Sequence, residues 1–155
     1  MNLIDTLIQA LDAGAARRSL LESYASGTQP LAFLTSEART AIGSRFSRMA
    51  VNVPRLVVTA LAERLRVTGF TVAGKADPQL WADWVANDLD QLAGIAHREA
   101  LTLGESYVIV WANKAGDPLV TIESAAQVAA LRDPATRAVV AAVKKWETSR
   151  STEAT

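Results

Sequence analysis

Apolar positions near the amino terminus recur every three or four residues, which is the spacing of one face of an α-helix. The residues in this first stripe are Leu3, Ile4, Leu7, Ile8 and Leu11. The pattern weakens at Gly14, because glycine is costly inside a helix. It resumes at Leu20 and stops at Gly27, a residue suited to end a helix. Residues 3–27 are therefore predicted to form two short helices or one kinked helix.

Two further helices are predicted before residue 66. Thr35 or Ser36 can cap a short helix that runs to Ile42. A longer helix is expected to begin at Pro54, because proline is favoured in the first turn. Its apolar side comprises Leu56, Val57, Val58, Leu61, Ala62 and Leu65, and its polar stripe comprises Arg55, Thr59 and Glu63.

After this helix the pattern alternates between strand and helix. Residues 67–72 are rich in β-branched and aromatic side chains and predict a strand. Asp77, which is followed by proline, is suited to cap a new helix that breaks near Asn87. One of the two aspartates that follow can begin another helix, which ends at Gly104.

A hairpin is the clearest pattern in the chain. Residues 105–111 and 119–122 are strand-forming, and residues 113–118 form a turn between them. The hairpin carries no catalytic group at its tip, which favours a scaffold over an active site. Residues 124–131 are compatible with a short helix or a strand, and residues 138–146 favour a strand.

Together these elements predict a single α+β domain over residues 1–148. Helices within residues 3–66 are expected to pack on a small, mostly antiparallel sheet. Residues 149–155 form a polar tail that we expect to be disordered. Half of the 155 residues are apolar and 21% are charged, as in ordinary globular proteins.

Composition excludes several classes of function. The chain has no cysteine, so disulfides, thiol nucleophiles and cysteine-based metal sites are absent. No apolar run approaches the ~20 residues of a membrane-spanning helix, and we expect no membrane partner. The acidic amino-terminal stretch, with Asp5 and Asp12, does not resemble a signal peptide, which favours assembly inside the cell.

The net charge is zero but unevenly distributed. Residues 37–66 hold six arginines against two glutamates, a net charge of +4. Residues 75–99 hold five acidic and two basic residues, a net charge of −3. Both segments are compatible with solvated helix faces, and they are also compatible with complementary faces of a self-associating protein.

The candidate catalytic and metal-binding residues lack companions. His97 is the only histidine, and Glu99 would point elsewhere on the same helix. Asp83, Asp88 and Asp90 do not follow the spacing of a calcium loop. No serine lies in a nucleophile elbow and no glycine-rich phosphate loop is present. We therefore expect no enzyme activity, no cofactor and no metal.

Aromatic and basic residues suggest contacts instead. Trp81 and Trp84 are expected in the core, against a sheet, with an exposed aromatic anchor as the alternative. Arg45, Arg48 and Arg55 could form structural salt bridges, contact a neighbouring subunit or meet a DNA backbone.

Two stretches carry a resemblance to a known family. They are RMAVNVPRLVVTALAERLRVTGF at residues 48–70 and AHREALTLGESYVIVW at residues 96–111. Both resemble the amino-terminal wing region of tailed-bacteriophage portal proteins, as do residues 24–34 and the segment from Ile122 to Arg137.

The resemblance implies a structural subunit of a ring, typically a dodecamer, at one capsid vertex through which DNA is packaged and ejected. It implies as partners other portal subunits, the terminase, capsid or scaffold proteins and head-completion proteins, with non-specific DNA contact at most. The location would be the virion, and the host bacterial cytoplasm before assembly. The stem, clip and crown of the family would lie beyond residue 155, so a truncated gene, as in a prophage, or an excised piece is expected.

Two other functions are compatible with the residues alone. One is a small nucleic-acid-binding module that uses the arginine-rich segment, and salt-dependent binding to duplex DNA would distinguish it. The other is an enzyme without a recognisable motif, which the lack of a nucleophile–base pair disfavours.

Overall fold

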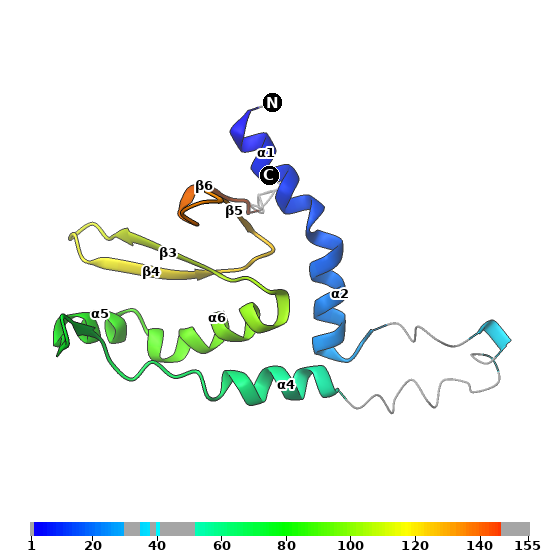
Figure 1. Ribbon diagram of the computed structural model, residues 1–155, viewed down its shortest axis with the longest axis horizontal. Helices are drawn as coiled ribbons and strands as arrows, with labels where there is room; N and C mark the ends of the chain where they lie inside the picture. Colours follow the sequence, from blue (N-terminus) through cyan, green and yellow to red (C-terminus); the bar gives the residue numbers. More distant parts are fainter. Residues whose placement is uncertain (1, 30–34, 38–39, 41–51, 147–155) are drawn as a thin grey trace, which may run out of the picture.

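A computed structural model describes residues 2–29, 35–37, 40 and 52–146. The fold is α+β, as the sequence predicts. In Figure 1, α1 and α2 form a column along one side, and α4, α6 and the β3–β4 hairpin lie beside it in successive layers. The β5–β6 hairpin lies against α1, and α5 lies at the far end of α6.

Two helices open the chain, as expected. Helix α1 spans Leu3–Ala13 and α2 spans Ala15–Ser26, with Gly14 between them. Gly27 ends α2 with a φ of 78°, a left-handed conformation that favours glycine. The short helix predicted up to Ile42 lies mostly outside the described residues, although Ser36, Glu37 and Thr40 are helical.

The next helix, α4, spans Val53–Ala62 and begins one residue before the predicted Pro54. Asn52 caps it, because the Asn52 Oδ1 accepts a hydrogen bond from the Arg55 backbone N–H at 2.9 Å. The Asn52 Nδ2 also donates to the carbonyl oxygen of Ala25 at 2.8 Å. One side chain therefore fixes the start of α4 beside the end of α2.

The strand predicted at residues 67–72 is much shorter in the structure. Only Thr71–Val72 (β1) is a strand, and it pairs with Lys75–Ala76 (β2), which the sequence analysis missed. Ala73 and Gly74 both have positive φ, at 50° and 77°, as a two-residue hairpin turn requires. The early turn leaves residues 67–70 outside the ladder.

The two helices before the main hairpin are confirmed. Helix α5 spans Pro78–Ala86, and the Asp77 Oδ1 caps it by accepting from the backbone N–H groups of Gln79 and Leu80. Helix α6 spans Leu89–Leu103 and ends at Gly104, which has a φ of 87°.

Four longer strands follow and pair as two antiparallel hairpins. Strand β3 (Tyr107–Ala112) pairs with β4 (Pro118–Glu123), and β5 (Val128–Arg132) pairs with β6 (Val139–Lys144). The ambiguous segment 124–131 is therefore a turn followed by a strand. Among the described residues the strands form three two-stranded sheets, where the sequence analysis expected one small sheet.

The buried core is small and lies in two places. Leu7 and Leu11 of α1 meet the β5 region, where Ala125, Val128 and Ala129 are buried. Leu89 and Leu103 are buried near the two ends of α6. Because a two-stranded hairpin is marginally stable alone, each long hairpin depends on the helix that packs against it. The predicted polar tail 149–155 lies outside the described residues.

Candidate functional site

Of the three arginines predicted to make intermolecular contacts, only Arg55 lies within the described residues. Arg55 lies exposed in the first turn of α4, and its side chain forms no ion pair within the described part of the chain. Arg45 and Arg48 lie outside the described residues. The structure therefore leaves the role of these two residues as an expectation.

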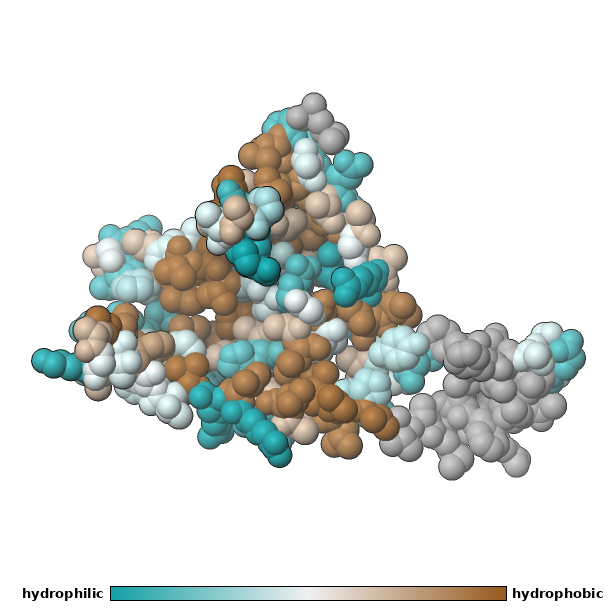
Figure 2. All heavy atoms as spheres, viewed as in Figure 1, coloured by the Kyte–Doolittle hydropathy of each residue, from teal (hydrophilic) through white to brown (hydrophobic). Residues whose placement is uncertain are grey.

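The apolar side of α4 is turned largely to solvent. Val58 and Ala62 are half-buried, together with Thr59 of the predicted polar stripe, and α4 packs on α6. The remaining large apolar side chains are between 46% and 66% exposed, and we call them the α4 face: Val53, Leu56, Val57, Leu61 and Leu65. Figure 2 shows this apolar colouring along the lower edge of the molecule, over α4. A contiguous exposed apolar patch marks an interaction surface.

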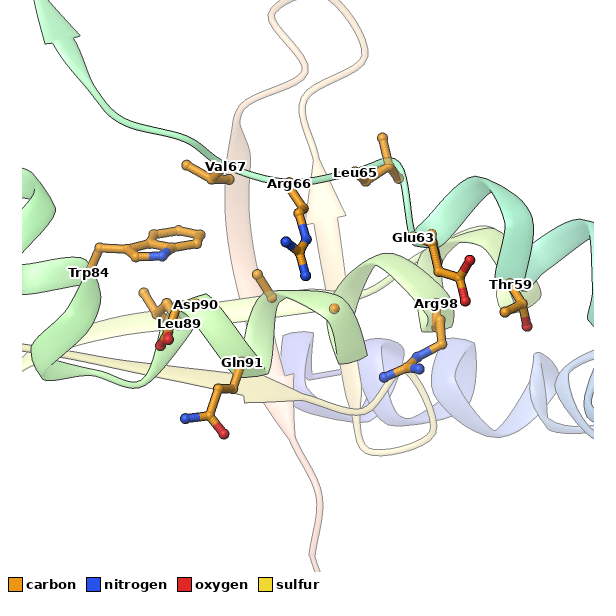
Figure 3. Close-up of a pocket in the computed structure, with 13 residues that line it drawn as sticks. Thr59, Glu63, Leu65, Arg66, Val67, Trp84, Leu89, Asp90, Gln91 and Arg98 are labelled. Atoms are coloured by element: carbon orange, nitrogen blue, oxygen red, sulfur yellow. The ribbon is translucent and has the colours of Figure 1, made fainter.

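Three arginines lie in α4 and in the residues directly after it. Arg55, Arg64 and Arg66 are exposed, and the single acidic residue among them is Glu63. Arg55 has the helical spacing of Thr59, on the side of α4 opposite the α4 face, and Arg66 points toward α6 (Figure 3). The sequence predicted this helix and its start to within one residue, but α4 ends at Ala62, before the predicted Glu63 and Leu65, and the pattern did not show which residues would face outward.

A groove of about 680 Å³ separates α4 and the residues after it from α6. Figure 3 shows the Arg66 side chain pointing from the segment after α4 toward α6, with the Trp84 indole to one side. The groove also holds Glu63, Asp90 and Arg98, so both signs of charge are present. Among the described residues, its lining contains no histidine and no serine.

His97 and Glu99 have separate surroundings on α6. His97 is half-buried, and its Nδ1 has no hydrogen-bond partner among the residues that the structure describes. Glu99 instead accepts from the hydroxyls of Ser106 and Ser124, at 3.0 and 2.9 Å, and from the backbone N–H of Ala125 at 3.0 Å. Glu99 thus joins α6 to the start of β3 and to the turn before β5, and it does not orient His97.

The acidic residues considered for metal binding act locally. The Asp83 Oδ1 accepts from the Gln79 side chain at 3.0 Å on the same helix. Within residues that the structure describes, no group of three or more histidine, aspartate or glutamate side chains gathers at one point. In the same residues, no helix is both long and apolar enough to cross a bilayer.

The tryptophans of α5 pack around Phe70, which precedes β1. The Phe70 ring lies 6.3 Å from that of Trp81 and 5.4 Å from that of Trp84, measured between ring centres. Trp84 is half-buried, and within the described ranges its Nε1 has no hydrogen-bond partner, whereas Trp81 is partly exposed. The segment after α4 therefore joins α5 through an aromatic cluster.

Two polar contacts that sequence reasoning missed hold the hairpins in place. The Asn87 side chain donates to the Pro118 carbonyl at 3.1 Å and accepts from the Val120 N–H at 2.8 Å. Glu123 is buried and forms an ion pair with Lys144 at 2.6 Å, across the two hairpins. The hydrogen bond from Lys144 lowers the pKa of the Glu123 carboxyl, against the opposing effect of burial.

Comparison with known proteins identifies the family. A family model described as phage portal protein, SPP1 Gp6-like, matches residues 44–154, a range that contains α4 and every later element. The portal protein of Mycobacterium phage L5 is 33% identical over 112 residues, which are 64% of this chain and 23% of that protein. The portal protein of Mycobacterium phage D29 is 42% identical over 62 residues, which are 39% of this chain and 13% of that protein.

The chain therefore spans less than a quarter of the length of these curated relatives. The family consists of structural virion proteins that assemble into the portal, and the scaffold-like fold with its exposed helix face is compatible with such a role. The family match covers more than half of the chain, so this protein belongs to the SPP1 Gp6-like family of phage portal proteins.

Proposed function

We propose that this chain forms part of the wing of a portal ring at one vertex of a phage capsid. Such a ring is the channel through which DNA is packaged and ejected. The family match over residues 44–154 carries the proposal, because it contains all of the described elements from α4 onward. The α4 face supports it, since a ring subunit needs apolar surface for its neighbours.

The proposal assigns no reaction to the chain. A structural subunit of a ring needs contact surfaces and a stable fold. Asn87 and Glu99 contribute to the fold, because their side chains form hydrogen bonds with backbone groups in and next to the hairpins. The proposed partners are other portal subunits, and then the terminase, capsid or scaffold proteins and head-completion proteins. The proposed location is the virion, and the host cytoplasm before assembly.

Arg45, Arg48 and Arg55 are proposed contacts to a neighbouring subunit or to the DNA backbone. Arg55 is exposed at the start of α4 and forms no ion pair within the described residues, so its guanidinium is available for either contact. The alternative, a small nucleic-acid-binding module, has less support. Most of its arginine-rich segment lies within residues 44–154, which match the portal family.

The test is assembly. Size-exclusion chromatography with light scattering is applied to this chain and to any longer product of the same locus, followed by electron microscopy of negatively stained particles. We expect annular particles from the product that contains the whole portal sequence, and peptides of this chain in purified phage heads. A product that stays monomeric and is absent from heads would refute the proposal.

A further inference from the structure

Strand β3 of the β3–β4 hairpin is apolar on both of its faces. Val108 and Val110 lie on one face and are 55% and 66% exposed, and Trp111 lies on the other face and is 54% exposed. Opposite Val108 and Val110, the β4 residues Ile122 and Val120 are half-buried. Helix α6 packs on β4, which in Figure 1 is the strand nearer to that helix. The helix therefore covers β4 and leaves this face of β3 exposed.

The register of the hairpin shows which backbone groups of β3 point away from β4. The Val120 N–H donates to the Asn87 side chain at 2.8 Å, so it points away from β3. Residues directly opposite each other in an antiparallel pair either exchange both hydrogen bonds or both point outward. Val110 is opposite Val120, so the Val110 N–H and C=O point outward, and alternation gives the same direction to those of Val108 and Ala112.

These outward groups of β3 have no protein partner in the part of the chain that the structure describes. The opposite edge of the hairpin is different, because Asn87 occupies the Pro118 C=O and the Val120 N–H, and a proline begins β4. Charged residues, prolines and bulges normally prevent pairing at an edge strand. Strand β3, with the sequence YVIVWA and an unbroken register, has none of these features. One edge of the hairpin is thus closed and the other is open.

We propose that the open edge of β3 binds an extended segment of the portal polypeptide from outside residues 1–155, which adds a third strand to the hairpin. The inference rests on the proposed portal function and adds to it a partner for this edge. Outward N–H and C=O groups on alternate residues match the backbone of a β-strand, and the uncharged side chains of β3 favour apolar cross-strand neighbours.

The length of the relatives favours this source of the strand. The chain covers 23% of the portal protein of Mycobacterium phage L5, so more than three-quarters of that protein lies outside the matched region. A two-stranded hairpin is marginal by itself, and a third strand supplies the backbone partners that β3 lacks. Two copies of β3 that pair with each other would instead make a two-fold contact, which is complete in a dimer and cannot continue around a ring.

Amide hydrogen exchange, resolved for single residues, tests the pairing directly. This chain is compared with the product that contains the whole portal sequence. Ile109 and Trp111 are internal controls, because their N–H groups point toward β4 and should be protected in both samples. Val108 and Val110 should exchange quickly in this chain and at least about tenfold more slowly in the complete sequence.

Two results would overturn the proposal. One is fast exchange of Val108 and Val110 in the complete sequence, because the edge would then be open in the whole protein. The other is slow exchange of the same residues in this chain, either at every concentration or only when the chain is concentrated. In that case the chain itself or a second copy occupies the edge without the remaining sequence.

A pair of variants separates backbone pairing from burial of the side chain. Val110→Pro removes the outward N–H and leaves the bonds to β4, whereas Val110→Thr, the matched control, also replaces the valine but keeps the N–H. In the complete sequence, Val108 should exchange at least about tenfold faster in the proline variant than in the threonine variant. Equal exchange would mean that burial protects Val108 without an added strand, which would overturn the proposal.

Protection of Ile109 and Trp111 in this chain checks that each variant keeps the hairpin. If the proline variant loses it, the comparison of the two wild-type samples decides.

Failure of this inference can be told apart from failure of the portal function. If the complete sequence forms rings in which Val108 and Val110 exchange quickly, the portal function stands and the third strand is wrong. If the complete sequence forms no ring, the portal function itself fails, whereas slow exchange of these residues would still support the third strand.

Discussion

Polar side chains that reach backbone groups connect distant segments of this chain. Asn52 joins α4 to α2, Asn87 joins the α5–α6 junction to β4, and Glu99 joins α6 to the turn before β5. Each bond satisfies a backbone group that has no partner in its own helix or strand, and an unsatisfied buried group is costly. Three residues far apart in the sequence therefore determine how the elements are placed.

Replacement of Asn87 by alanine should destabilise the fold by about 1–3 kcal/mol. The change removes the partner of the Val120 N–H and of the Pro118 carbonyl, along the edge of β4 that does not pair with β3. Asn87→Asp should be similarly harmful, because a carboxylate can accept from Val120 but repels the Pro118 carbonyl. Urea denaturation measures both effects.

Gln91→Ala, an exposed position on the neighbouring helix α6, is the control and should change the free energy of unfolding by less than about 0.5 kcal/mol. If Asn87→Asp were as stable as the wild type, the contact with the Pro118 carbonyl would not contribute to the fold.

Glu123 should make the fold sensitive to acid. Its pKa is lowered in the folded chain by the hydrogen bond from Lys144, from an ordinary value of 4.5. A carboxyl whose pKa is depressed by folding contributes stability above its unfolded pKa and loses that contribution as the pH falls through the folded value. Unfolding by urea, measured from neutral pH to below 4.5, should show this loss.

The Glu123→Gln variant should be less stable at neutral pH and should lose less stability on acidification than the wild type. Some acid sensitivity should remain, because backbone N–H groups of Thr136 and Ala135 also lower the pKa of Asp133. Identical pH profiles for the wild type and the variant would contradict the assignment to Glu123.

At the level of elements, each long hairpin of the fold depends on a helix. Helix α6 covers β4, and α1 contacts both β5 and β6. An ion pair of 3.1 Å between Asp12 and Lys145 lies at the edge of the α1 contact. The hairpins are local in sequence, but the helices that support them come from elsewhere in the chain.

Leu11→Ala should destabilise the chain by about 2–5 kcal/mol, because Leu11 is only 3% exposed where α1 meets the β5–β6 hairpin. Leu3→Ala, at a position of α1 that is 51% exposed, should cost less than about 0.5 kcal/mol. Thermal melts followed by circular dichroism compare the two. Equal melting temperatures for the two variants would mean that α1 does not pack on the hairpin.

Local signals predicted most of these elements. The cap at Asp77, the stop at Gly104 and the alternation in β3 act within a few residues, so sequence reasoning found them. It failed at residues 67–72, where the early turn at Ala73 and Gly74 limits pairing to two residues. It also missed the contacts of Asn87 and Glu99, because no local pattern shows which distant backbone a polar side chain will reach.

For the molecule as a whole, the outward orientation of α4 could not be predicted. An apolar helix side normally faces the core, and only the position of α6 shows that Val58 and Ala62 face inward while Leu56 and Leu61 do not. Among the described residues, seven apolar side chains are buried, while 23 large ones are exposed. Under the proposed function, this exposed surface is available for contact with neighbouring portal subunits.

A chain with so small a core should gain stability from association. If copies associate through the α4 face, only folded chains associate, and mass action raises the melting temperature with protein concentration. We expect the melting temperature of the wild type to increase between about 5 and 500 μM, and that of Leu61→Glu to stay constant. Differential scanning calorimetry measures both, with Leu3→Glu expected to behave as the wild type. A melting temperature independent of concentration in all three chains would show that the exposed apolar surface does not contribute to stability through self-association.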